Sequence, residues 1–155
     1  MQVVKGFLRL AVLALTALLL VALAASGCGK TAAPERSEEE RVAEEAIRVA
    51  MRGDAVTFLQ LVAPSFLERA RSEMPDAEPE TLGAVLLAGF SEKVPYTGAG
   101  DLFFEVSEEG DRAVVHVWGE FLDPEGNAVS LGQGEALRVP LLREGGRWYI
   151  DLLDL

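Results

Sequence analysis

The arrangement of apolar and polar residues changes twice along the chain. A continuous apolar run comes first, a spacing of three and four residues follows up to about residue 90, and alternation of every second residue occupies the rest. Spacings of three and four are typical of one-sided helices, and alternation is typical of half-buried strands. The order predicts an α+β domain in which N-terminal helices pack on one face of a curved antiparallel sheet of roughly four to six strands.

Local signals place the helices. Ser37 followed by Glu40 has the spacing of a capping box, which predicts the start of a helix. Gly53 ends that helix, Asp54 caps a second one, and Pro64 begins a third. The buried stripe of the first helix is expected to contain Val42, Ala43, Ala46, Ile47, Ala50 and Met51. A fourth helix is expected to carry Leu82, Val85, Leu86, Gly89 and Phe90 at helical spacing.

Strands are expected in the alternating part of the chain. The candidates are Leu102 to Ser107, Arg112 to Leu122, Ala128 to Leu142 and Arg147 to Leu152. Gly132 and Gly134 predict a bulge or a break in the third candidate. Two-residue turns at 109–110 and 144–145 would bring apolar residues together on one face. The first turn pairs Leu102, Phe104 and Val106 with Val117, Val115 and Ala113, and the second pairs Leu137, Val139 and Leu141 with Leu152, Ile150 and Trp148.

The other face of this sheet is expected to be aromatic and polar. It would carry Phe103, Glu105, His116, Trp118, Glu120, Arg138, Tyr149 and Asp151. Aromatic residues with a charged rim are enriched at protein contacts. We therefore consider a partner patch formed by Phe103, His116, Trp118, Glu120, Arg138 and Tyr149. The alternative is that the aromatic residues only stabilise cross-strand pairs, because isolated apolar residues are common on protein surfaces.

The apolar run has the features of a secretory leader. Lys5 and Arg9 precede sixteen residues, Leu10 to Ala25, that are Ala, Leu or Val except for Thr16. A membrane span needs about 20 apolar residues, so a cleavable signal peptide over residues 1–27 is favoured over a permanent helix.

The end of this leader, Leu23-Ala24-Ala25-Ser26-Gly27-Cys28, resembles the lipobox of bacterial lipoproteins. The resemblance implies diacylglyceryl modification of Cys28, cleavage before it, and an extracytoplasmic domain held to the membrane by lipid. Residues 28–36 would form a short tether and residues 37–155 the domain. The alternatives are an uncleaved signal anchor or a cysteine that is simply a small buried residue.

Charge limits the partners of the domain. The chain has a net charge of -11, and removing residues 1–27 takes away two basic residues and no acid, which leaves -13. Such a domain repels phosphate backbones and anionic headgroups, so we expect no nucleic acid partner and membrane contact only through lipid on Cys28. A second copy of the chain or an envelope protein is the partner we consider.

The order of helices before a meander of long strands, the helix-Gly53-Asp54 junction and the final Arg147-Trp148-Tyr149 strand resemble the nuclear transport factor 2-like superfamily. The resemblance covers residues 37–155 and implies a cone-shaped α+β fold with either a pocket between sheet and helices or a dimer through the sheet. Members include isomerases, dehydratases and non-catalytic accessory domains, so the fold does not choose the function.

Residues for common catalytic systems are scarce. His116 is the single histidine and Cys28 the single cysteine. We therefore expect no nucleophilic triad, no metal site and no cofactor. Asp123, Glu125 and Asn127 have part of a calcium-loop spacing, but a hairpin turn explains them better because Ala128 stands where the loop needs glycine. A non-catalytic module is expected, and a small-molecule carrier or an isomerase-like enzyme with a buried acid under the helices is the alternative.

Overall fold

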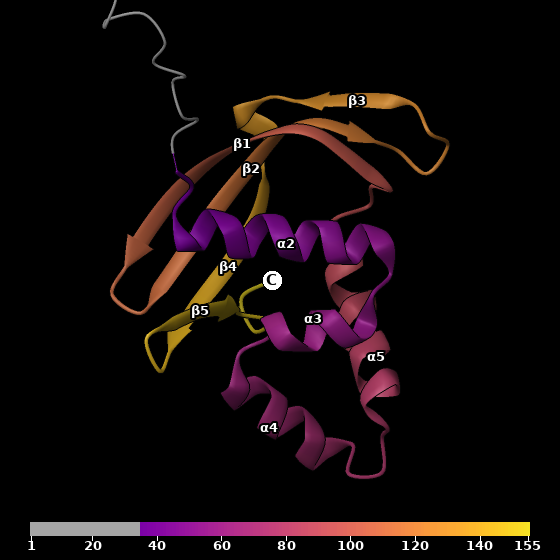
Figure 1. Ribbon diagram of the computed structural model, residues 1–155, viewed down its shortest axis with the longest axis vertical. Helices are drawn as coiled ribbons and strands as arrows, with labels where there is room; N and C mark the ends of the chain where they lie inside the picture. Colours follow the sequence, from indigo (N-terminus) through magenta and orange to yellow (C-terminus); the bar gives the residue numbers. More distant parts are fainter. Residues whose placement is uncertain (1–34) are drawn as a thin grey trace, which may run out of the picture. The chain divides into compact units, whose positions relative to one another are not determined.

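The computed structural model describes residues 35–155, so the predicted leader, Cys28 and most of the tether lie outside the described residues. Within the described part, helices precede strands, as predicted (Figure 1). The helices are α2 (Glu38–Arg52), α3 (Ala55–Leu61), α4 (Pro64–Glu73) and α5 (Pro79–Ser91). The strands are β1 (Gly98–Glu109), β2 (Arg112–Leu122), β3 (Ala128–Leu131), β4 (Leu137–Glu144) and β5 (Arg147–Ile150), with a short 3-10 turn η1 (Gln133–Glu135). Among residues 35–155, no helix combines the length and the apolar character that crossing a membrane requires.

The predicted caps of α2 and α3 are confirmed. The Glu40 backbone N–H donates to Ser37 Oγ at 3.2 Å, and the Ser37 N–H donates to Glu40 Oε2 at 3.0 Å. Gly53 ends α2 in the left-handed region with φ 67°, where glycine carries no Cβ penalty. The Thr57 N–H donates to Asp54 Oδ1 at 3.0 Å, and the hydrogen bonds from Thr57 hold the pKa of the Asp54 carboxyl below its ordinary value. These bonds connect neighbouring residues, so the sequence alone specifies them.

Helices α3 and α5 approach each other closely at a glycine. A Cβ added to Gly83 would lie 2.4 Å from the backbone oxygen of Ala55, well inside van der Waals contact. About two turns further along α5, the rings of Phe90 and Phe58 meet with centroids 5.2 Å apart. Gly83 therefore has a packing role that outweighs its low helix propensity.

Helix α4 takes its N-terminal cap from the sheet. Its own N-cap residue, Ala63, makes no side-chain capping bond. Instead the Ser65 N–H donates to Glu144 Oε2 at 3.2 Å, and the Ser65 hydroxyl donates to the other oxygen of the same carboxylate. A carboxylate at this position also complements the helix dipole.

The five strands form one sheet with the order β1-β2-β4-β5, and β3 pairs with the far end of β2. The break predicted at Gly132 and Gly134 is confirmed, because η1 separates β3 from β4. Strand β1 begins at Gly98, earlier than the predicted Leu102, and its register with β2 shifts between Ala99 and Leu102. The last strand ends at Ile150 instead of Leu152.

The predicted faces are confirmed, but both predicted hairpin registers are wrong by two residues. Phe104 lies opposite Val117 and Val106 opposite Val115, while Leu141 lies opposite Ile150. The actual turns are 110–111 and 145–146, because a tight hairpin turn needs positive φ at its first central residue and, in one of the two common types, at the second as well. Gly110, Gly145 and Gly146 supply this with φ of 64°, 58° and 82°. A shift by two residues keeps every side chain on its face.

Gly119 allows the sheet to bend at the β1 irregularity. Its φ is 133°, and an added Cβ would lie 2.1 Å from the backbone oxygen of Asp101. Both the dihedral angle and the space exclude other residues. On the far side of Gly119, β2 stops pairing with β4 and begins pairing with β3.

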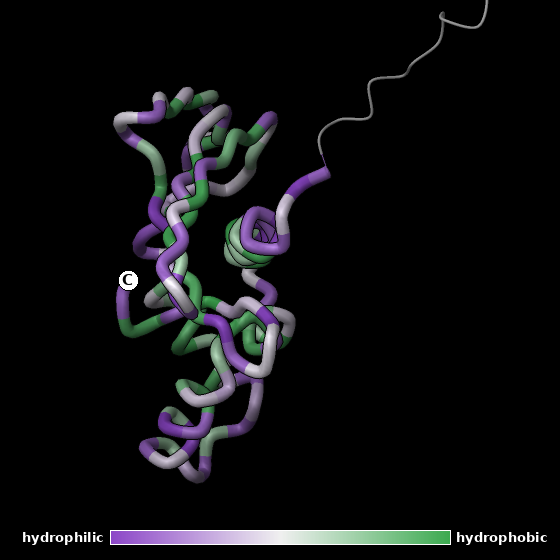
Figure 2. Tube along the Cα trace, turned by 90° about the vertical axis from the view of Figure 1, so that its left-hand side faces the viewer, coloured by the Kyte–Doolittle hydropathy of each residue, from purple (hydrophilic) through white to green (hydrophobic). Residues whose placement is uncertain are grey.

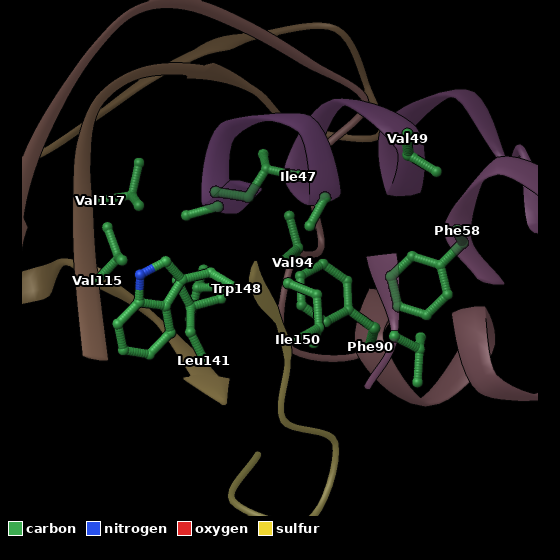
Figure 3. Close-up of a cluster of buried hydrophobic side chains, with 14 of the residues drawn as sticks. Ile47, Val49, Phe58, Phe90, Val94, Val115, Val117, Leu141, Trp148 and Ile150 are labelled. Atoms are coloured by element: carbon green, nitrogen blue, oxygen red, sulfur yellow. The ribbon is translucent and has the colours of Figure 1, made fainter. Parts of the chain in front are cut away.

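The core lies between α2 and the inner face of the sheet. Figure 2 shows α2 beside the strands, along which hydrophilic and hydrophobic residues alternate. In Figure 3, Val115, Val117 and Leu141 from the sheet lie beside Trp148 and face Ile47 of α2. Ala43, Ala46 and Ile47 of the predicted α2 stripe are fully buried, whereas its other members only pack against the core from the side. Val49, which the predicted stripe omits, is fully buried as well.

Candidate functional site

An aromatic pair lies on the outer sheet face, between the border strand β1 and its neighbour β2. Phe103 of β1 is opposite Trp118 of β2, and their rings are nearly parallel, with centroids 6.2 Å apart and an angle of 23° between the planes. Phe103 is 56% exposed, which is high for a large apolar side chain, and Trp118 is half-buried. The observed register creates this pair, because the predicted register would have placed Phe103 opposite His116.

Polar residues follow the aromatic pair along the same face. Glu105 lies opposite His116, and His116 lies opposite Arg138, so three neighbouring strands contribute one polar row. The Gln133 side-chain amide donates to Glu105 Oε2 at 2.7 Å. Gln133 belongs to η1, which links β3 to β4 beside Trp118. No local pattern predicts this contact, because it depends on how η1 folds over the sheet.

Two members of the predicted patch lie at different distances from the aromatic pair. Glu120 is on the same face of β2 two residues beyond Trp118, and it is exposed. Tyr149 lies opposite Leu142, which lies opposite Arg112. Arg112 is six residues from Trp118, which is about 20 Å along a strand. Tyr149 therefore belongs to the outer face but lies apart from the aromatic pair, and Arg147 stacks on its ring at 5.6 Å.

Asp151 is not part of an exposed rim, which corrects the prediction. The residue is only 3% exposed. Its carboxylate accepts a hydrogen bond from the Leu153 N–H at 3.1 Å and lies 3.4 Å from Nη1 of Arg112. The strand ends one residue before Asp151, so the following chain turns back and covers it. Asp151 holds the C-terminal segment against the sheet.

The space between sheet and helices is lined by apolar side chains. The largest fully buried residues there include Phe58, Phe90 and Phe121. Within residues 35–155, Asp151 is the buried charged residue, and it lies on the outer face with Arg112. A buried acid under the helices, which an isomerase-like reaction would need, is therefore missing from the described interior.

The segment from Asp123 to Asn127 is a hairpin turn, as predicted. Asp123 Oδ1 accepts from the Asn127 N–H at 2.7 Å, and Oδ2 accepts from the Asn127 side-chain amide at 3.0 Å. These bonds hold the pKa of the Asp123 carboxyl below its ordinary value. The carboxylate is thus used inside the turn. In the part of the chain that the structure describes, no cluster of three or more His, Cys, Asp or Glu residues could hold a metal ion.

Comparison with known proteins assigns no family to the chain. No family model matches the chain. The search of curated proteins also finds no match. Among solved structures, the fold is similar to a chain from Campylobacter jejuni described as "Putative NTF2-like transpeptidase", with 17% sequence identity and a TM-score of 0.45. The similarity covers 74% of this chain and 97% of that one. A likeness of this size assigns neither activity nor family, so the fold class stands on the observed helices and antiparallel sheet.

Proposed function

We propose that the chain is a lipid-anchored, extracytoplasmic binding or accessory module of the nuclear transport factor 2-like type, without catalytic activity of its own. In this proposal the leader directs export, lipid on Cys28 holds the protein to a bacterial membrane, and the outer sheet face contacts a partner. The observation that carries the proposed binding role is the exposed Phe103 ring stacked beside Trp118 on that face.

The surroundings of the aromatic pair support a protein contact. Aromatic residues bring large contact area at a low cost in side-chain entropy, and they are enriched where proteins meet. Glu105 and Arg138 flank the pair with opposite charges. Within the described residues Arg138 makes no ion pair of its own. Its charge is therefore free to meet a carboxylate on a partner.

A second copy of the chain is the partner we propose for this face. A two-fold axis through the patch would place Arg138 of each copy near a glutamate of the other, which satisfies the self-complementarity that such interfaces require. Elsewhere the surface is dominated by acids, since the chain carries a net charge of -11, and two copies would repel each other there. An envelope protein is the alternative occupant.

The proposed contact is tested by replacing its aromatic residues. Phe103→Ser with Trp118→Ser is expected to shift sedimentation of the purified protein from dimer to monomer and to abolish cross-linking between copies in intact cells. Val85→Ser is the matched control, because Val85 is 51% exposed but lies on α5. Tyr149→Ser should have a weaker effect, because Tyr149 lies apart from the pair. Unchanged sedimentation of the double variant, or monomeric sedimentation of the unmodified protein, would rule out self-association through this face.

Lipid attachment is tested separately by mass spectrometry of the N-terminus isolated from cells. The expected peptide begins at Cys28 and carries the mass of a diacylglyceryl group, and Cys28→Ala should remove both the lipid and the membrane association. An intact leader, or an unmodified cysteine at the new N-terminus, would contradict the anchoring proposal.

The alternative function, a small-molecule carrier or isomerase-like enzyme, needs a ligand space under the helices. The described interior holds no buried acid beneath the helices, which disfavours the isomerase-like reaction but not a carrier of apolar molecules. Titration with an apolar dye distinguishes the two functions. A carrier would bind the dye in its interior, and the bound dye would slow hydrogen exchange of core amides. A module that binds only through its surface would show no such slowing.

A further inference from the structure

Strand β1 is a long edge strand whose second side is unpaired. It spans Gly98–Glu109, and within the described residues it pairs with β2 alone. Figure 1 shows β1 at the border of the sheet on the side of β2 away from β4. Within the described residues, no backbone hydrogen bond joins the other side of β1 to any segment. The regular part, Leu102–Glu109, therefore presents a free row of backbone donors and acceptors about 27 Å long.

The other borders of the sheet are short or covered. Strand β3 has only four residues. Strand β5 also has four, and its free side is occupied by the chain before α4, where Val62 bridges Ile150 and the Ala63 N–H donates to the Ile150 carbonyl at 3.2 Å. Proteins usually blunt such edges with short strands, proline, charged residues or bulges. Strand β1 contains no proline and its irregularity ends at Leu102, so Leu102–Glu109 is a long, regular edge on which only the glutamates oppose pairing.

The charges on β1 select the partner of this edge. Between Leu102 and Glu109 the strand carries three glutamates and no basic residue. Pairing two β1 edges would bring six carboxylates together, and like charges opposite each other destabilise a ladder. A second copy is thus disfavoured at the edge, in contrast to the sheet face. An extended segment with lysine or arginine at alternating positions would instead place its cations beside Glu105 and Glu109, which share the outer face.

We infer that the free edge of β1 binds an extended, basic segment of another protein by strand addition, with backbone hydrogen bonds to Leu102–Glu109 and ion pairs to the β1 glutamates. This interaction goes beyond the proposed sheet-face contact, because it uses the backbone of the strand and requires neither Trp118 nor lipid on Cys28. The two surfaces share only Phe103 and Glu105 of β1.

The first test uses an eight-residue peptide that alternates lysine and valine as the probe. Its binding to the purified protein is expected to slow amide hydrogen exchange at alternate residues of Leu102–Glu109. A peptide with glutamate in place of lysine should not bind. Two further versions of the lysine peptide carry N-methyl groups on one or the other alternating set of amides. Only methylation of the amides that face β1 should abolish binding. In an added strand, the N–H groups of every second residue point toward the neighbouring strand, and the others point away from it.

The second test changes the protein. Glu105→Gln with Glu109→Gln is expected to weaken binding of the lysine peptide by about tenfold, since two cross-strand charge pairs are lost. The matched control is Glu68→Gln with Glu73→Gln, which removes the same charge from α4. Unchanged exchange protection in α2 reports that each variant is folded.

Four outcomes would overturn the inference. They are the absence of peptide binding, equal binding of both N-methylated peptides, equal weakening by the α4 control, and protection of the β1 amides before any peptide is added. The last outcome would mean that the chain fills its own edge. None of them changes the expected sedimentation of the Phe103 and Trp118 variants, so failure here is distinguishable from failure of the proposed function.

Discussion

Helix α5 contains two glycines with different surroundings, Gly83 and Gly89, and replacing each with alanine tests the packing of α5 on α3. Replacing either Gly83 or Gly89 with alanine gains about 1 kcal/mol in helix propensity. An added Cβ at Gly89 has no atom within 4 Å, so Gly89→Ala should stabilise the protein by about 0.5 to 1 kcal/mol. At Gly83 the Cβ would lie 2.4 Å from the Ala55 backbone oxygen, about 1 Å closer than ordinary contact.

The cost at Gly83 follows from the identity of the obstructing atom. A backbone oxygen cannot rotate away, so α3 and α5 must separate and loosen the contact between Phe58 and Phe90. Overpacking of this kind costs about 3 kcal/mol at the upper end of its usual range. Subtracting the propensity gain leaves a net destabilisation of about 2 kcal/mol for Gly83→Ala. The two variants should thus differ by about 3 kcal/mol although their chemical change is identical.

The measurement is urea unfolding followed by tryptophan fluorescence, with buried Trp148 as the main reporter. With an m-value of about 2 kcal/mol/M, the midpoints of the two variants should differ by about 1.5 M. Adding Ala55→Gly to Gly83→Ala should not restore stability, because the obstructing oxygen belongs to the backbone. Equal midpoints for Gly83→Ala and Gly89→Ala would refute the close approach of α3 and α5.

Two further predictions concern the sheet and the turns. Gly119→Ala should destabilise the protein by about 3 kcal/mol or more, because it combines an unfavourable φ with a clash against Asp101, whereas Gly132→Ala has free space and should change the urea midpoint little. Asp54 and Asp123 have lowered pKa values in the folded protein, so their stabilising effect is present above the unfolded pKa and is lost as the pH falls through the folded pKa. Asp54→Asn with Asp123→Asn should therefore flatten the loss of stability below about pH 4, and an unchanged acid unfolding profile would contradict this.

Features that depend on neighbouring residues could be predicted from the sequence. The capping box at Ser37 and the cap at Asp54 involve partners three residues away, and period-two alternation assigned the sheet faces correctly. Both hairpin registers could be predicted as well, because Gly-Asp at 110–111 and Gly-Gly at 145–146 are typical sequences of two-residue turns. The turn at 145–146 has glycine at both central positions, which fits the observed φ values better than a turn that begins at Glu144.

Features that depend on tertiary contacts could not be predicted. The burial of Asp151 requires the chain after β5 to turn back over the sheet, and nothing local to that residue signals the turn. The contact of Gln133 with Glu105 joins positions 28 residues apart. For the candidate patch, alternation along the sequence predicted which face of the sheet each residue occupies. It could not predict how far Tyr149 lies from Trp118, because that distance depends on the order and register of the strands.

The cap that Glu144 gives to α4 has a consequence for the order in which the protein acquires its structure. Ser65 and Glu144 are 79 residues apart, so this bond can form only after β4 has been synthesised and has joined the sheet. Until then α4 is a ten-residue helix without a side-chain cap, and a helix of that length is marginal by itself in water. A growing chain that has emerged only as far as β3 would therefore keep α4 frayed, and a protease acting on nascent chains would find its cleavage site there.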